Sequence, residues 1–87
     1  MKFNPGNIVA TPGALSLKAQ GVNLCGYLQR HLNGDWGDLC DEDKAENAFS
    51  LKHGFRLLSA FNTPLGQLWI ITEADRSATT FLLPEEY

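Results

Sequence analysis

The chain has 87 residues, of which 44% are hydrophobic and 20% are charged, with a net charge of −3. This length supports one hydrophobic core, so we expect a single domain over residues 1–87, and the composition excludes a disordered chain. No apolar run reaches the about 18 residues of a membrane span, and Pro5 and Gly6 interrupt the start where a signal peptide needs an apolar stretch. We therefore expect a cytoplasmic protein with no membrane partner.

The first third of the chain predicts a short strand followed by two helices. Residues 7–11 lie between two Pro-Gly pairs and are typical of a short strand. Thr11 is placed as the N-cap of a helix that has Pro12 at its first position and ends at Gly21. Asn23 can cap the second helix, which ends at Asn33-Gly34 and whose predicted apolar face is Leu24, Tyr27, Leu28, His31 and Leu32.

A third helix is predicted over residues 41–53. Its first turn is acidic, its last turn contains Lys52 and His53, and Gly54 follows as a C-cap, an order that suits the helix dipole. The expected buried face of this helix consists of Ala45, Ala48, Phe49 and the alkyl stem of Lys52.

The final third predicts an antiparallel meander. Residues 55–61 and 68–72 are rich in aromatic and aliphatic side chains, and the sequence Thr63-Pro64-Leu65-Gly66 between them suits a hairpin turn. A second turn at 75–77 leads to a third strand over residues 79–83. The expected fold is therefore α+β, with about three helices packed on one face of a three-stranded antiparallel sheet. The strand at residues 7–11 either joins one edge of that sheet or stands apart.

The middle strand of this meander carries two further features. Trp69 lies in an apolar run and is expected in the core. Glu73, Asp75 and Arg76 follow it, and an ion pair that ties the turn is favoured over a group that binds substrate.

Charge is unevenly distributed along the chain. Residues 1–34 contain three basic and no acidic residues, whereas residues 35–48 contain six acidic residues and only Lys44 as a basic one. Three dispersed cations neutralise few phosphates, so direct nucleic-acid binding is not expected. The acidic block either neutralises the basic third within the fold or meets a basic protein partner.

Trp36 lies within this acidic block and is a candidate for contact with a partner. A tryptophan framed by charged residues is typical of a binding hot spot, although a tryptophan that covers the core beneath a loop fits the same pattern. The candidate binding residues are Asp35, Trp36, Asp38, Asp41, Glu42 and Asp43.

His31, Asp35 and Asp38 are the candidates for chemistry. Imidazole and carboxylate ligands can hold a divalent cation that activates water against a phosphodiester or an ester. The same carboxylates also suit a polar turn, and His31 shares an apolar helical face. Neither a cysteine-based metal motif, a nucleophile elbow nor a phosphate loop is present. We therefore expect no enzyme and no cofactor, with a metal-dependent hydrolase or nuclease as the alternative.

Several segments resemble a known family. They are Gly34-Asp35-Trp36-Gly37-Asp38, the helix with Asp43, Glu46 and Asn47, the segment Arg56-Leu57-Leu58-Ser59-Ala60, and the C-terminal runs 69–80 and 83–87. Through them, nearly the whole chain resembles small bacterial proteins found with plasmids and integrative elements, which are described as plasmid-related and sometimes as a type I restriction subunit. The chain has no Asn-Pro-Pro-Tyr-type methyltransferase motif.

This resemblance implies a mobile-element origin, and it supplies no established catalytic residue to carry over to this chain. Such elements benefit from small proteins that bind and inhibit host defence complexes, such as CRISPR or restriction effectors. We therefore expect a non-enzymatic protein-interaction module that binds a protein partner through its acidic surface.

Overall fold

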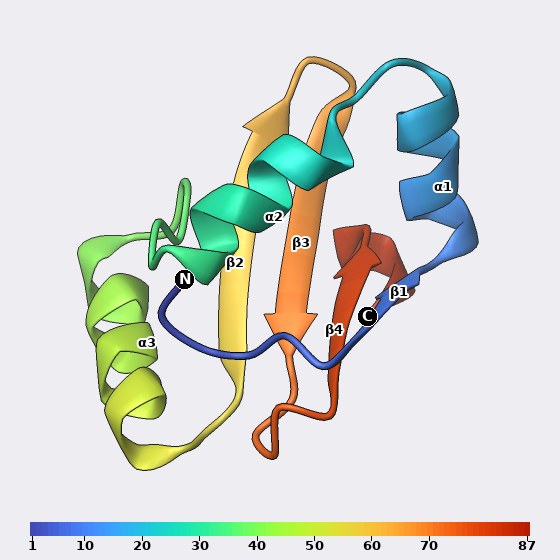
Figure 1. Cartoon of the computed structure of the whole chain (residues 1–87). Helices are drawn as coiled ribbons and strands as arrows, with labels where there is room; N and C mark the ends of the chain where they lie inside the picture. Colours follow the sequence, from blue (N-terminus) through green and yellow to red (C-terminus); the bar gives the residue numbers. More distant parts are fainter.

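The computed structural model describes all 87 residues as one mixed sheet with three α-helices (Figure 1). The strands lie in the order β1-β4-β3-β2; β2, β3 and β4 form an antiparallel meander, and β1 joins it in parallel beside β4. The predicted α+β fold is therefore confirmed, with the first strand at one edge. The elements are β1 (Asn7–Ala10), α1 (Pro12–Ala19), α2 (Leu24–Leu32), α3 (Asp41–His53), β2 (Leu57–Thr63), β3 (Gly66–Thr72), β4 (Ala78–Leu82) and the 3-10 helix η1 (Pro84–Glu86).

The helix boundaries follow from local capping. The Thr11 side chain accepts a hydrogen bond from the Ala14 N–H at the start of α1, and the Asn23 side chain accepts one from the Gly26 N–H at the start of α2. At the end of α3, Gly54 adopts a left-handed conformation with φ of 76°. No helix has both the length and the apolar character needed to cross a membrane.

The core lies between the sheet and the first two helices. In Figure 1, α2 crosses in front of β2 and β3, and α1 lies toward the β1 side of the same face. Alternate residues of the meander point toward these helices, because successive side chains of a strand lie on opposite faces. The main cluster of buried side chains consists of Ala14, Leu17, Val22, Leu24, Phe61, Leu68, Ile70 and Phe81.

Helix α3 lies beside β2 rather than over the sheet (Figure 1). Its buried residues are the polar Asn47 and Ser50, whereas Phe49 is 54% exposed and its ring stacks on that of Phe55. The predicted buried face of Ala45, Ala48, Phe49 and Lys52 is therefore wrong. The reason is that α3 meets the hydrogen-bonding edge of β2. There an amide side chain can bond to the free main-chain N–H and C=O groups, which an apolar side chain would leave without partners.

The outer edge of β2 is sealed by hydrogen bonds. The Asn47 amide donates to the Leu58 C=O and accepts from the Leu58 N–H, as a neighbouring strand would. The Ala60 N–H donates to the Trp36 C=O, and the Asp38 N–H donates to the Ala60 C=O. This arrangement blocks the edge to further strand pairing.

Trp69 lies on the sheet face opposite the helices, which corrects its expected place in the core. Leu68 and Ile70 are fully buried on the helix side, so the residue between them points the other way and is only half-buried. Its indole meets the Tyr87 ring edge-on at 5.7 Å, and its Nε1–H donates to the Gln67 side chain.

The turn between β3 and β4 is held by backbone contacts rather than by the expected ion pair. The Arg76 guanidinium donates to the carbonyl oxygens of Phe55, Glu73 and Ala74. The Glu73 carboxylate instead lies 3.7 Å from Arg56. Arg76 therefore ties the turn to the loop before β2, because a guanidinium has enough donors to serve several carbonyls.

Candidate functional site

His31 is a buried structural residue. Its Nδ1 lies 2.5 Å from the Ser59 hydroxyl and its Nε2 lies 2.9 Å from the Thr72 hydroxyl. Burial, with a smaller contribution from the positive charge of Arg76, lowers the pKa of His31 to about 4. The imidazole is therefore neutral at neutral pH and has both ring nitrogens engaged within the core.

The proposed metal site of His31, Asp35 and Asp38 does not form. The structure contains no group of three or more His, Cys, Asp or Glu side chains placed to hold a metal ion. His31 is fully buried, whereas both aspartates are exposed. The three residues are close in sequence, but α2 buries the imidazole inside the sheet face, while the following turn leaves the carboxylates outside.

Trp36 is buried, so of the two alternatives the structure confirms the tryptophan that covers the core beneath a loop and contradicts the partly exposed hot spot. Its side chain is 7% exposed, and its indole stacks near Phe3 at 6.4 Å and meets the His31 ring at 5.7 Å. The cause is the parallel bridge between Gly37 and Ala60, which pins this turn to β2 and turns the indole inward.

The acidic candidates divide into two groups. Asp35 pairs with the Arg30 guanidinium at 2.7 Å, and this hydrogen bond lowers the pKa of Asp35. The Asp38 carboxylate accepts the Asn62 N–H at 2.8 Å, so both aspartates have structural partners. The second group is exposed in the first turn of α3, where the helix dipole favours acids. It consists of Asp41, Glu42 and Asp43.

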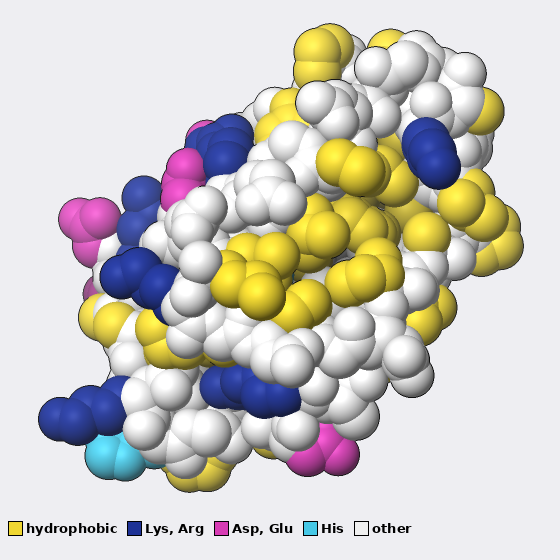
Figure 2. All heavy atoms as spheres, in the orientation of Figure 1, with side chains coloured by type: hydrophobic (Ala, Val, Ile, Leu, Met, Phe, Trp, Pro, Cys, Tyr) yellow, Lys and Arg dark blue, Asp and Glu magenta, His cyan; other side chains and the backbone are white.

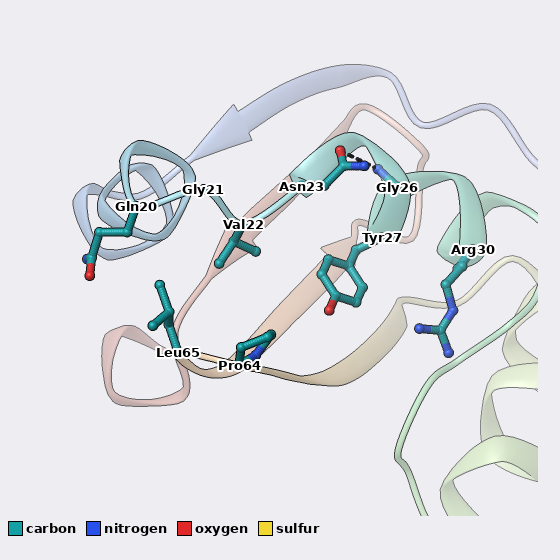
Figure 3. A pocket seen from close by; sticks show the side chains of 9 residues that line it. All are labelled: Gln20, Gly21, Val22, Asn23, Gly26, Tyr27, Arg30, Pro64 and Leu65. Carbon is teal, nitrogen blue, oxygen red and sulfur yellow. Dashed lines mark hydrogen bonds between the residues drawn. The ribbon is translucent and has the colours of Figure 1, made fainter.

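One hollow lies between the start of α2 and the β2–β3 turn and has a volume of about 580 Å³ (Figure 3). Figure 3 shows the Tyr27 ring pointing toward Pro64, with Arg30 at one end and Gln20 at the other. The single charged residue of this hollow, Arg30, is already neutralised by Asp35. The hollow therefore presents mixed polarity with no free charge. It is lined by Gln20, Gly21, Val22, Asn23, Gly26, Tyr27, Arg30, Pro64 and Leu65.

A second hollow, which we call the β1 groove, lies between β1, α1 and α2 and has a volume of about 400 Å³. Nine of its 11 lining residues are hydrophobic, and Lys18 is the one charged residue. Figure 2 shows hydrophobic side chains gathered between α2 and the α1–β1 side of the molecule. The groove is lined by Ile8, Val9, Ala10, Leu15, Lys18, Val22, Asn23, Leu24, Cys25, Leu28 and Phe81.

The strand edge beside this groove is open. The N–H groups of Asn7 and Thr11 donate to β4-side carbonyls, at Ser77 and Phe81 respectively, each at 3.0 Å. In a parallel pair alternate residues face the partner, so the main-chain groups of Ile8 and Ala10 point away from the sheet. One edge of the sheet is thus sealed at β2, and the other is available at β1.

The sequence interpretation did not single out the β1 groove. One local signal was present, because Pro5 and Pro12 flank the strand and proline is confined to sheet edges. The approach of α2 to this edge depends on tertiary packing, so no local sequence pattern indicates it. Comparison of the chain with protein-family models, curated proteins and solved structures finds no match.

Proposed function

We propose that the chain is a non-enzymatic protein-interaction module and that the β1 groove is its binding surface. The observation that carries the proposal is the clustering of half-exposed apolar side chains beside an open strand edge. Ile8 and Leu15 are 48% and 51% exposed, and they line one hollow together with Leu28. Single exposed hydrophobic residues are ordinary, but a contiguous hollow of them marks a site of association.

The groove is favoured over the acidic surface as the main contact. Trp36 is buried, and Asp35 and Asp38 have partners within the fold. The remaining carboxylates, those of Asp41, Glu42 and Asp43, lie in the first turn of α3. Their favourable interaction with the helix dipole explains them without a binding partner. Apolar exposure has no such internal explanation, because it costs free energy in water.

We further propose that the module acts in the cytoplasm on a host defence complex. Two exposed and unpaired thiols, Cys25 and Cys40, support a reducing compartment. The resemblance to proteins of plasmids and integrative elements supports the class of partner. In cells that carry a restriction or CRISPR effector, the chain should raise plasmid transformation, and the Leu15→Asp variant should not. Equal transformation with and without the chain would contradict this assignment.

The two cysteines provide a matched test of the binding surface. Cys25 lines the groove, whereas Cys40 immediately precedes the acidic start of α3. A photo-crosslinking maleimide is attached at Cys25 in a Cys40→Ser background, or at Cys40 in a Cys25→Ser background. Each labelled protein is then irradiated in an extract of the cells in which the gene resides.

We expect a discrete adduct from Cys25 that unlabelled protein competes away and that Leu15→Asp removes. Adducts from Cys40 alone would contradict the assignment of the groove as the binding surface and would favour the acidic surface instead. Absence of a competed adduct from either position would overturn the interaction module itself.

A further inference from the structure

We infer that β1 binds an extended peptide segment as an additional strand, and that an acidic side chain of this segment contacts Lys18. The inference rests on the proposed function and names the chemistry of the partner at the same site. Strand addition to an exposed sheet edge is an established mode of peptide recognition, in which main-chain hydrogen bonds supply affinity and alternate side chains supply specificity.

The main-chain groups for strand addition are already in place. Ile8 and Ala10 each present one N–H and one C=O away from β4, and the structure records no partner for these groups. The contrast with the sealed edge of β2 is informative, since proteins normally protect such edges. Here one edge is closed by Asn47 and by the turn at 36–38, while the other is left open next to an apolar hollow.

The register of β1 decides which side chains of the segment would be apolar. Ile8 is aligned with Thr79 and Ala10 with Phe81, and both β4 residues are buried on the helix side of the sheet. Ile8 and Ala10 therefore lie on that face, where the groove is. Alternate residues of an added strand would point to the same face, on which Leu15 and Leu28 also line the groove. The occupant is thus expected to have apolar residues at every second position.

The charge of the groove predicts that the bound segment contains an acidic residue. Lys18 is its only charged lining residue and belongs to neither of the ion pairs of the fold. A cation beside apolar surface attracts a carboxylate more strongly than one in open water does. A second copy of the chain fits less well, because β1 itself, Asn7-Ile8-Val9-Ala10, contains no acidic residue. Pairing of two β1 strands would leave Lys18 without a counter-charge from that strand.

A charge-swap selection tests this inference. A displayed library of random twelve-residue peptides is selected on the purified full chain and, in parallel, on Lys18→Glu and on Lys52→Glu as the control on α3. We expect wild type and the control to enrich peptides with alternating apolar residues and one Asp or Glu. The Lys18→Glu variant should enrich Lys or Arg at that position. With a peptide selected on wild type, Lys18→Gln should weaken binding about fivefold.

The open edge is tested by a pair of substitutions at one position. Ile8→Pro removes an N–H that has no partner within the fold, whereas Ile8→Thr trims the side chain and keeps the N–H. We expect Ile8→Pro to weaken binding of the selected peptide by about tenfold or more, and Ile8→Thr by less. If Ile8→Pro does not fold, a peptide N-methylated at the position opposite Ile8 provides the same test on the wild-type chain. The amides of Ile8 and Ala10 should exchange with solvent more slowly in the complex.

Three results would overturn the inference. They are enriched peptides with apolar residues at helical spacing, the same charge preference for wild type and Lys18→Glu, and self-association in sedimentation that Ile8→Pro abolishes. In each case a competed adduct from Cys25 would still support the interaction module. Loss of that adduct would instead contradict the proposed function. Failure of the strand-addition inference can therefore be distinguished from failure of the interaction module.

Discussion

The imidazole of His31 meets the indole of Trp36 edge-on, with ring centroids 5.7 Å apart and planes at 77°. Both side chains are buried, and the imidazole hydrogen bonds to Ser59 on β2 and Thr72 on β3. This pair joins α2, the turn before α3 and the sheet. Residues that looked like parts of a metal or binding site therefore form part of the interior.

The first prediction concerns the pH dependence of stability. The pKa of His31 is lowered from 6.5 to about 4 in the folded protein, so between these values the unfolded chain binds more protons than the folded one. The free energy of unfolding should therefore fall as the pH decreases from 6.5 toward 4, by about 2 kcal/mol at pH 5. Urea unfolding at pH 7, 6 and 5 measures this loss. The His31→Gln variant, which cannot titrate, should show a smaller decrease over the same range, and an equal decrease would contradict the assignment to His31.

The second prediction compares the two tryptophans. Trp36 is 7% exposed within the core, whereas Trp69 is half-buried on the far face of the sheet. Trp36→Ala should lower the free energy of unfolding by about 3–5 kcal/mol, because it leaves a cavity. Trp69→Ala should cost about 1–2 kcal/mol. Urea melts of both variants decide the order, which is the reverse of the one expected if Trp69 lay in the core and Trp36 at a binding surface. A larger loss for Trp69→Ala would contradict the structure.

The third prediction uses two glycines with nearly the same backbone angle. Gly37 has φ of 77° and Gly54 has φ of 76°. A Cβ at Gly37 would overlap the Ala60 carbonyl oxygen and the Phe61 ring, whereas one at Gly54 would meet nothing within 4 Å. Gly54→Ala should cost about 1 kcal/mol of backbone strain, and Gly37→Ala about 3 kcal/mol or more. Similar thermal melts for the two variants would show that the turn at Gly37 does not pack closely on β2.

The fourth prediction concerns the sealed edge of β2. Asn47→Ala removes both hydrogen bonds to the Leu58 main chain and should cost about 1–3 kcal/mol. It should also promote aggregation in light scattering, because it exposes strand groups that were covered. Glu46→Ala on the exposed side of the same helix is the control and should change stability by less than about 0.5 kcal/mol. Equal behaviour of the two variants would show that α3 does not protect the edge.

Much of the fold could be predicted because it depends on residues close together in sequence. The caps at Thr11 and Asn23, the glycine end of α3 and the hairpin turn before Gly66 each involve a few neighbouring residues. Strand alternation and the meander follow from the same local rules. These features determined the α+β class and the element order by sequence alone.

The sites depended on relationships between distant residues. Trp69 lies outside the core because the alternation of side chains along β3 turns it to the face opposite the helices. Trp36 lies inside the core because its turn is bridged at Gly37 to Ala60, 23 positions further along the chain. The apolar β1 groove arises because β1 pairs with β4 and not with its neighbours in sequence, which leaves Ile8 and Ala10 at an open edge. Local propensity carries no information about such pairings, since they are set by how the whole chain buries its apolar surface.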